Sequence, residues 1–478
     1  MIAFDSSFTM TIDGKGEEGA ATLPVINPAT ETLVAMSPDA SMAQLDQAVE
    51  AARRAFPLWR ARPLAERQET LRRMGEAILA HLDELKRLLT SEHGKPHADA
   101  ERELRGAAYW CATYAGFSLP ERVTLDTPER RSVTRRVPIG VVGAIAAWNF
   151  PITLASWKVV PAILAGNTVV LKPSPFTPLT TLKIVELWRE ILPPGVVNVI
   201  SGGDALGPAM TAHPGIDKIT FTGSTATGMK VMAGAAETLK RVTLELGGND
   251  PAIVFPDVDV EATARDLFWA AFANNSQICV AVKRLYVHED IYDAFAKALV
   301  DYAATVKVGD GAEQGTGIGP IQNRPQFERV MALIEDARRQ GLAFLSGGIG
   351  RPEGKGYFVP LTVVDNPPDD SRVVREEAFG PVLPLLKFKD TDEVIRRAND
   401  SEYGLAASVW TKDGALAEEV ASQLDAGTVW INETRVMSPF TAFGGHKRSG
   451  IGVENGEEGL LEFTNVHTTV TRRQAPQA

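Results

Sequence analysis

Cysteine is nearly absent from this chain of 478 residues, which contains only Cys111 and Cys279. A disulfide framework beyond one possible bridge is therefore excluded, and we expect a cytoplasmic, thiol-reducing setting. Long apolar runs are also absent, since no segment approaches the roughly 18 residues that cross a membrane. The first residues, Met1–Thr11, lack the basic start and the apolar core of a signal peptide. We therefore expect no membrane association.

Basic residues are fewer than acidic ones: the chain has 49 Lys and Arg and 60 Asp and Glu, which gives a net charge of −11. A broad basic face for nucleic acid is therefore not expected. The seven histidines are scattered, and the chain has neither H-E-x-x-H nor C-x-x-C, so we expect no metal site. Hydrophobic residues make up 44% of the chain, which excludes a mostly disordered protein. At roughly 100–200 residues per domain, the length indicates about two to four domains.

The chain does contain a repeated alternation of strand-like and helix-like segments. Short runs of small and β-branched residues, typical of buried parallel strands, alternate with amphipathic segments over about a hundred residues. This rhythm predicts a doubly wound, mostly parallel sheet. The predicted strands are Ile139–Ala147, Asn167–Leu171, Val196–Ile200, Lys218–Thr222 and Val242–Leu246.

The pattern then starts again and predicts a second α/β domain. Glu121–Val137 and His467–Arg472 fit neither half, because the first alternates charged and apolar residues as a hairpin does and the second is a β-prone run. Exposed edge strands seek partners, so together they indicate an oligomerisation flap. The strands predicted for the second domain are Ala252–Val254, Leu285–His288, Val363–Val364, Val382–Phe388, Ala406–Trp410 and Thr428–Ile431.

Two motifs stand at predicted strand ends, where an open α/β sheet binds ligands. In FTGSTATG, Phe221–Gly228, hydroxyl residues follow a strand and begin a helix, as at a phosphate site. Its two glycines have Walker A spacing, but Met229 and the residues after it break the required ending. An ordinary capped turn is the alternative. Lys172 could hold a ribose or a phosphate, or it could be a solvated lysine.

Three residues are candidates for chemistry. Cys279 follows polar neighbours, which favours a partly exposed reactive thiol over an inert core cysteine, whereas Cys111 has the surroundings of helix packing. Glu245 stands inside an apolar strand beside two glycines, so it is either a general base with a raised pKa or a salt-bridged structural residue. Asn149 could donate to an oxyanion, or it could be a turn residue.

Taken together, these residues belong to a set of motifs that resembles the aldehyde dehydrogenase superfamily across essentially the whole chain. Seven motifs in family order are far more specific than any one of them. They are WNFP (Trp148–Pro151), LKPS (Leu171–Ser174), FTGSTATG (Phe221–Gly228), LELGGN (Leu244–Asn249), SQIC (Ser276–Cys279), EEAFGPV (Glu376–Val382) and FGGHKRSG (Phe443–Gly450).

The resemblance implies that Cys279 attacks an aldehyde to form a thiohemiacetal and then, after hydride transfer to NAD or NADP, a thioester. Asn149 and the Cys279 backbone N–H would form the oxyanion hole. Glu245 would help deprotonate the thiol and would activate the water that hydrolyses the thioester, which favours release of a free acid over transfer to coenzyme A. Lys158 and Glu454 match the positions of a proton relay. A non-catalytic cofactor-binding protein of the same fold, or an esterase-like acyl hydrolase, is the alternative.

The resemblance also implies the binding residues. Glu377 would hold the nicotinamide ribose and Phe379 would lie against the nicotinamide. Lys172 would bind the adenosine ribose, Ser224 the pyrophosphate, and Gly203 would lie near the adenine. Further cofactor-binding residues are Trp148, Ser174, Gly223 and Leu246, and the substrate pocket comprises Phe150, Trp157, Arg435, Met437 and Phe443.

Three departures from the family pattern stand out. Pro175 occupies the position where many NAD-preferring members have a glutamate that repels a 2′-phosphate, so NADP stays open and NAD is favoured on family frequency. Ser276 replaces a usual glycine, and if that backbone needs a positive φ, serine costs strain. Asn249 stands where lysine is common, which is tolerable.

The substrate is poorly determined by the sequence. Ala273 is small where some relatives have an aromatic residue, which predicts a wider tunnel. Arg435 lies in the segment that lines the tunnel mouth in relatives, and it could pair with a distal carboxylate. A solvated arginine is the favoured alternative, and a medium or aromatic aldehyde suits the apolar walls equally.

The implied fold is aldehyde-dehydrogenase-like, with a Rossmann-like cofactor domain, an α/β catalytic domain and a small β oligomerisation flap that makes homodimers or homotetramers. We expect the cofactor domain at residues 1–118 and 139–247 and the catalytic domain at 248–448. The oligomerisation segments are expected at 119–138 and 460–478.

Overall fold

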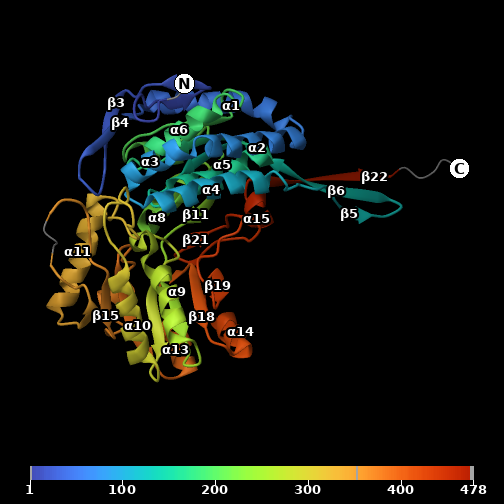
Figure 1. Cartoon of the computed structure of the whole chain (residues 1–478). Helices are drawn as coiled ribbons and strands as arrows, with labels where there is room; N and C mark the ends of the chain where they lie inside the picture. The colour runs from blue at the N-terminus through green and yellow to red at the C-terminus, as the bar shows by residue number, and fades with distance from the viewer. Residues whose placement is uncertain (1–2, 351–353, 474–478) are drawn as a thin grey trace.

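Two lobes and a projecting sheet make up the molecule (Figure 1). The computed structural model describes residues 3–350 and 354–473. The upper lobe in Figure 1 contains the N-terminus, the lower lobe contains much of the second half of the chain, and a narrow sheet extends to one side. Within these described ranges, no helix is long and apolar enough to cross a membrane.

An eight-stranded sheet forms the middle of the upper lobe. Its five central strands are parallel and are the five that the sequence predicts. Four of them are buried along their whole length, which explains their largely apolar sequences. In sheet order the strands are β2 (Lys15–Glu17), β1 (Met10–Ile12), β9 (Val197–Val199), β8 (Thr168–Lys172), β7 (Val141–Ile145), β10 (Lys218–Thr222), β11 (Arg241–Glu245) and β21 (Gly450–Ile451).

Helix α5 (Pro151–Ala165) lies inside this lobe, and every residue in it except Thr153 is buried. A helix that is apolar on all sides belongs in a core. Its lysine, Lys158, is buried with it and so requires a polar partner inside the protein. The other helices of the lobe are α1 (Met42–Arg60), α2 (Leu64–Ala80), α3 (Leu82–His93), α4 (His97–Tyr114), α6 (Leu179–Trp188), α7 (Leu206–Ala212), α8 (Thr225–Ala236) and α15 (Gly456–Leu461).

A seven-stranded sheet organises the lower lobe and is parallel except at β14. All six predicted strands are present, and apolar clusters build up around the sheet. In sheet order the strands are β14 (Phe344–Ser346), β15 (Thr362–Asp365), β16 (Val382–Phe388), β13 (Val282–His288), β12 (Asp250–Val254), β18 (Ala406–Trp410) and β19 (Thr428–Ile431). The helices are α9 (Val260–Phe272), the 3-10 turn η1 (Ala273–Ser276), α10 (Tyr292–Thr305), α11 (Arg324–Arg339), α12 (Arg372–Arg375), α13 (Thr391–Asn399) and α14 (Gly414–Gln423).

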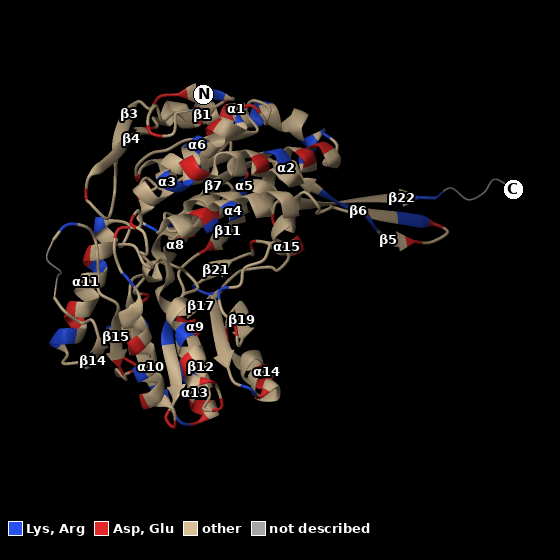
Figure 2. Cartoon of the chain, in the orientation of Figure 1, with Lys and Arg blue, Asp and Glu red and all other residues tan. Residues whose placement is uncertain are grey.

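The projecting sheet consists of β5 (Arg122–Asp126), β6 (Arg130–Pro138) and β22 (Thr464–Arg472), in the order β22-β6-β5. The two segments that fit neither domain in the sequence therefore pair with each other, from Thr464 opposite Pro138 to Arg472 opposite Arg130. Part of β6 is blue in Figure 2, which marks its basic residues. The expected segment 460–478 extends over 474–478, which lie outside the described residues. Two small pairs complete the fold: β3 (Ala21–Ile26) with β4 (Leu33–Asp39), and β17 (Tyr403–Gly404) with β20 (His446–Lys447).

Candidate active site

A cavity of about 500 Å³ brings together residues from both halves of the chain. Several of them follow the carboxyl ends of the first sheet: Trp148 follows β7, Gly223 follows β10 and Leu246 follows β11. This is the edge at which open α/β sheets bind ligands. The predicted site residues that line the cavity are Trp148, Asn149, Phe150, Trp157, Gly223, Ser224, Leu246, Cys279, Glu377, Phe379, Arg435 and Met437.

The Cys279 loop leaves α9 through three consecutive residues with left-handed backbone. Asn274, Asn275 and Ser276 have φ values of 50°, 58° and 59°. Ser276 therefore does occupy a position that favours glycine, as anticipated from the sequence. Its buried hydroxyl donates a hydrogen bond of 2.5 Å to the Ala271 carbonyl, which offsets part of the strain. The loop presents Cys279, which is partly exposed, to the cavity.

The thiol of Cys279 is held in its neutral form. Burial raises its pKa to about 12; Lys283 acts against this, while Glu245, Asp250 and Glu377 raise the pKa further. Because a thiolate is the nucleophilic form, this cysteine needs a base or a bound ligand that changes its surroundings. The partial exposure of Cys279 at the cavity is the position that the sequence favours, and its reactivity stays a prediction.

Lys283 is a residue of this site that the sequence analysis missed. Its ammonium donates to the carbonyls of Ile278 at 2.9 Å and of Cys279 at 2.6 Å, and it lies 3.3 Å from the Glu377 carboxylate. The side chain is only 4% exposed. A lysine inside the apolar strand β13, four residues after the cysteine, was the available signal, because such a charge requires a partner. Lys283 therefore links the nucleophile loop to Glu377.

Asn149 is fixed in place and is more than a turn residue. Its side-chain nitrogen donates to the Gln277 carbonyl at 2.9 Å. Its own carbonyl accepts hydrogen bonds from Lys95 at 3.0 Å and from the side chain of Asn274 at 3.2 Å. A side-chain amide has two N–H donors, so one is free to point at a ligand in the cavity. These bonds hold the amide beside the Cys279 loop.

Glu245 lies outside the cavity lining, in a buried polar cluster. Neither of its carboxyl oxygens has a hydrogen-bond partner within the described residues, so it is not a salt-bridged structural glutamate. Burial raises its pKa well above the usual value, Glu454 raises it further, and Lys158 lowers it. Lys158 itself donates to Glu454 at 2.5 Å and to Thr222 at 2.6 Å. Thr222 lines the cavity, so the cluster reaches the site through it.

The cavity end near Glu377 is shaped by glycines and by an aromatic pair. A Cβ on Gly247 would collide with the Glu377 carboxylate, so only glycine lets that side chain lie against the end of the strand. Glu377 also accepts a hydrogen bond from the Gly248 N–H at 3.1 Å. Phe379 has a left-handed φ of 48° and packs edge-on against Trp148 at 5.4 Å between ring centroids. These features suit a flat ring attached to a sugar.

Other predicted cofactor residues lie outside the cavity lining, at the ends of β8 and β9. Lys172 is 6% exposed and so is not a solvated lysine. Burial lowers its pKa to about 8, while Asp204 and Asp39 raise it. Gly203 donates its N–H to Asp39 at 3.2 Å, and Ser174 accepts a hydrogen bond from the Phe176 N–H at 3.3 Å.

The phosphate motif starts a helix, as predicted. Ser224 is the N-cap of α8 and its hydroxyl accepts a hydrogen bond from the Thr227 N–H at 3.3 Å. A Cβ on Gly228 would collide with Leu246, so this glycine lets α8 pack closely on the strand end. A helix N-terminus, a buried lysine and a carboxylate at the strand ends are groups that fit a dinucleotide.

Two predicted pocket residues are placed differently from expectation. Phe443 is buried outside the cavity lining and packs edge-on behind Trp157, at 6.0 Å between ring centroids. It therefore supports the aromatic wall rather than forming it. Arg435, for which solvation was favoured, is partly buried, lines the cavity, and has a buried Nε without a partner in the described residues.

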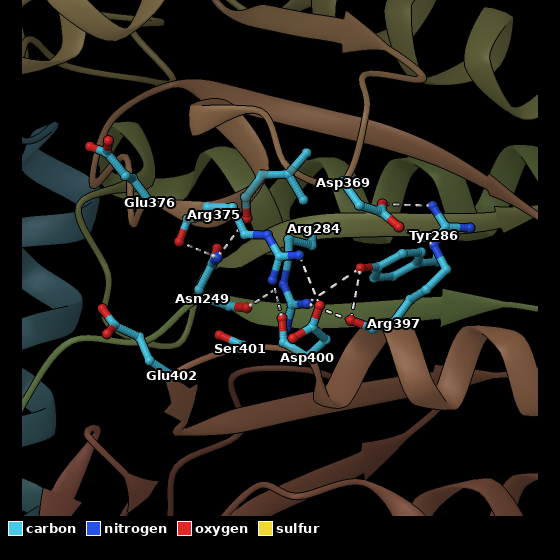
Figure 3. A pocket seen from close by; sticks show the side chains of 11 residues that line it. Asn249, Arg284, Tyr286, Asp369, Arg375, Glu376, Arg397, Asp400, Ser401 and Glu402 are labelled. Atoms are coloured by element: carbon cyan, nitrogen blue, oxygen red, sulfur yellow. Dashed lines mark hydrogen bonds and ion pairs between the residues drawn. The ribbon is translucent and has the colours of Figure 1, made fainter.

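A second hollow, of about 350 Å³, lies in the lower lobe and is rich in charge (Figure 3). Arg397 forms a two-pronged ion pair with Asp369 at 2.8 and 2.9 Å, and Arg375 pairs with Asp400 at 2.8 Å. Arg284 donates to three backbone carbonyls. Because these arginines are satisfied by the protein, this hollow offers no free cation to a ligand.

Comparison with known proteins agrees with this geometry. The model of the aldehyde dehydrogenase family matches residues 15–469. A probable aldehyde dehydrogenase of Pseudomonas sp is 45% identical over 469 residues, which cover 98% of this chain and 96% of the relative. The chloroplastic betaine aldehyde dehydrogenase of Beta vulgaris is 39% identical over 472 residues, which cover 95% of this chain and 94% of the relative.

Solved structures agree as well. The NAD+ complex of aldehyde dehydrogenase from Bacillus cereus has a TM-score of 0.96 and 39% sequence identity, with 98% of each chain covered. A putative aldehyde dehydrogenase from Burkholderia cenocepacia has a TM-score of 0.94 and 38% identity, with 97% of each chain covered. The resemblance drawn from the seven motifs is thereby confirmed, together with the fold class. This chain belongs to the aldehyde dehydrogenase family and is an NAD(P)-dependent enzyme that oxidises aldehydes.

Proposed function

We propose that Cys279 is the nucleophile of this oxidation, with Asn149 as oxyanion donor and Glu245 as base. The observation that carries the proposal is that the Cys279 thiol and the Asn149 amide line one cavity. The buried Glu245 carboxyl lies close enough to raise the pKa of the thiol. A nucleophile, an amide donor and a carboxyl of raised pKa are the three groups that thioester chemistry requires.

The first step forms a bond between the Cys279 sulfur and the carbonyl carbon of the aldehyde, while the thiol proton passes to a base. The Asn149 amide and the Cys279 backbone N–H donate to the developing oxyanion. A bound nicotinamide supplies the acceptor for the hydride that leaves this carbon. Cys279 then holds a thioester.

In the second step Glu245 removes a proton from water. The water oxygen bonds to the thioester carbon, the C–S bond breaks, and the acid leaves as the thiolate is restored. A pKa raised by burial makes Glu245 a stronger base than an exposed glutamate. The Lys158–Glu454 pair, 2.5 Å long and linked to Thr222, would take the proton onward.

For the cofactor, we propose that Lys172, Ser174 and Gly203 hold the adenosine end. Gly223 and Ser224 hold the pyrophosphate at the start of α8. Trp148, Leu246, Glu377 and Phe379 hold the nicotinamide end.

We propose a preference for NAD over NADP. Pro175 supplies no carboxylate to repel a 2′-phosphate, but Asp39 and Asp204 both act on the ammonium of Lys172. Two carboxylates near the proposed ribose position disfavour a further negative group there. The same site would accept the uncharged ribose hydroxyls of NAD.

We also propose that the enzyme acts as a homodimer or homotetramer, joined through the three-stranded flap, in the cytoplasm. The flap exposes Val466 and Val470 on β22 and Leu125 on β5, which a partner subunit would cover. Cys279 is a free thiol and has to stay reduced for its proposed role, which a thiol-reducing compartment ensures.

The test follows reduced-nicotinamide absorbance with aliphatic and aromatic aldehydes, and with NAD and NADP in parallel. Reduction by the wild type and not by C279A supports the proposal, and a higher kcat/KM with NAD supports the cofactor preference. Equal activity of C279A would remove Cys279 from the mechanism. Ester hydrolysis without any nicotinamide reduction would favour an acyl hydrolase instead.

A further inference from the structure

Arg435 is a partly buried cation at the wall of the catalytic cavity. Its Nε is buried and has no hydrogen-bond partner within residues 3–350 and 354–473. The arginines of the second hollow, by contrast, are paired with carboxylates or carbonyls. An unpaired buried guanidinium is costly, and a protein retains one where a ligand completes it.

The charges that face Arg435 do not neutralise it. Asp99 and Arg102, on α4, also line the cavity, and they form an ion pair with each other at 2.5 Å. Glu433, two residues before Arg435, is exposed. Burial lowers the pKa of Arg435, Arg102 lowers it further, and Asp99 and Glu433 raise it. A guanidinium still keeps its proton at neutral pH, so Arg435 is positively charged at this wall.

A second donor in the same cavity also lacks an acceptor. The indole N–H of Trp157 is buried and unpartnered within the described chain, and Trp157 lines the cavity. The cavity lining also includes the apolar side chains of Trp110, Leu154 and Met437. An arginine beside apolar side chains in one cavity matches an apolar substrate with an acceptor group away from its aldehyde.

The backbone at Arg435 supports a binding role. Its φ of 56° is in the left-handed region, which a long side chain rarely adopts. Strain of this kind gathers at ligand clamps, where the surrounding structure holds the residue in place. The segment after β19 thus turns the arginine towards the cavity at an energetic cost.

We infer that Arg435 binds a carboxylate at the end of the substrate remote from the aldehyde, so that the enzyme prefers aldehyde acids to neutral aldehydes of the same size. A guanidinium fork matches one carboxylate with two parallel hydrogen bonds. This inference rests on the proposed function, because the carboxylate is placed relative to an aldehyde at Cys279.

The experiment compares matched substrate pairs with NAD: 4-formylbenzoate against its methyl ester, and 6-oxohexanoate against hexanal. For the wild type, kcat/KM is expected to be about 10- to 100-fold higher for each acid, the range of a charge-assisted hydrogen bond. In R435Q this preference is lost, so that kcat/KM for each acid falls to about that of its neutral partner. R435K, which keeps the charge, restores part of it.

R105Q is the matched control, because it removes an exposed arginine of α4 that lies outside the cavity lining and pairs with Glu101 at 2.8 Å. It is expected to change the acid preference by less than about threefold. Equal kcat/KM for acid and neutral partners in the wild type would overturn the inference and leave aldehyde oxidation intact. An equal loss for both partners in R435Q would also overturn it, and would make Arg435 a structural residue. If the enzyme oxidises none of the aldehydes, the proposed function itself is rejected.

Discussion

At the scale of single residues, the charges packed around Cys279 set how readily its thiol reacts. Burial and three carboxyl groups raise the pKa of the thiol, and Lys283 is the cation that opposes them. The same ammonium holds the backbone carbonyl of Cys279 and faces Glu377. Lys283 therefore affects both the nucleophile and the residue proposed to hold the cofactor.

Replacing Lys283 by methionine is expected to slow the alkylation of Cys279 by iodoacetamide about tenfold or more at pH 8. The neutral side chain removes a stabilising charge from the thiolate, so the pKa rises, and each unit lowers the thiolate fraction tenfold. Mass spectrometry separates Cys279 from Cys111. K283R is the control, because it keeps the charge and should retain most of the rate. An unchanged pH profile in K283M would show that Lys283 does not act on the thiol.

Replacing Glu245 by glutamine is expected to stop the reaction once the thioester on Cys279 has formed. Oxidation still forms the thioester on Cys279, but the water lacks its base, so the steady rate falls by about 100-fold or more. Stopped-flow absorbance should show a burst of one reduced nicotinamide per active site followed by a very slow phase. C279A should show no burst. A slow rate without a burst in E245Q would assign Glu245 to thiol activation alone.

At the scale of secondary structure, a carboxylate from one helix caps another. Glu92, near the end of α3, accepts hydrogen bonds from the Leu179 N–H at 2.7 Å and the Thr180 N–H at 2.9 Å, at the start of α6. Burial nevertheless raises the pKa of Glu92 to about 7, although these bonds lower it. The fold therefore binds a proton at Glu92 more tightly than the unfolded chain does.

This linkage predicts that the Tm of E92Q rises relative to the wild type between pH 5 and pH 8. The folded pKa is raised, so the contribution of Glu92 to stability is greatest below about 4.5 and falls as pH rises towards 7, by about 3 kcal/mol in the limit. Glutamine does not titrate, so its contribution to stability does not change over that pH range. Calorimetry at several pH values measures the difference. E92A, which leaves two N–H groups without an acceptor, should be destabilised throughout. A constant difference between E92Q and wild type would contradict the raised pKa.

At the scale of the whole molecule, the three-stranded flap of β5, β6 and β22 stays largely exposed in the single chain. It projects away from both lobes (Figure 1), and residues along β22 and β5 are exposed. Val470 and Leu125 both lie opposite Ser132 on β6, so they share one face of the sheet. A face of this kind is where we propose that a second subunit packs.

V470D is therefore expected to dissociate the oligomer into subunits of 51.6 kDa, because a carboxylate in an apolar interface has no partner. Light scattering after gel filtration measures the mass. T471D places the same charge on the opposite face of β22 and serves as the control. An oligomer that survives V470D, or that T471D breaks equally, would move the interface to another surface.

Much of the fold followed from local patterns. The strands β10, β16, β18 and β19 have the bounds that the sequence predicts, because an apolar run between turn residues marks a buried strand almost by itself. The helices α1 to α3 were not predicted, and of α4 only the helical surroundings of Cys111 were. Phe443 was placed in the tunnel wall by its motif, but the packing of Trp157 covers it.

The sequence by itself determined the α/β class and the two series of alternating strands and helices, and it named Cys279, Asn149 and Glu245 as candidates, because these patterns rest on neighbours a few residues apart. Only the tertiary structure decided that the Glu245 carboxyl and the buried Nε of Arg435 lack partners among the described residues, and that Lys283 holds the nucleophile loop against Glu377. Each of these depends on which charges lie within a few ångströms after distant segments meet. Burial and pairing are properties of that packing, so no local pattern in the chain can specify them.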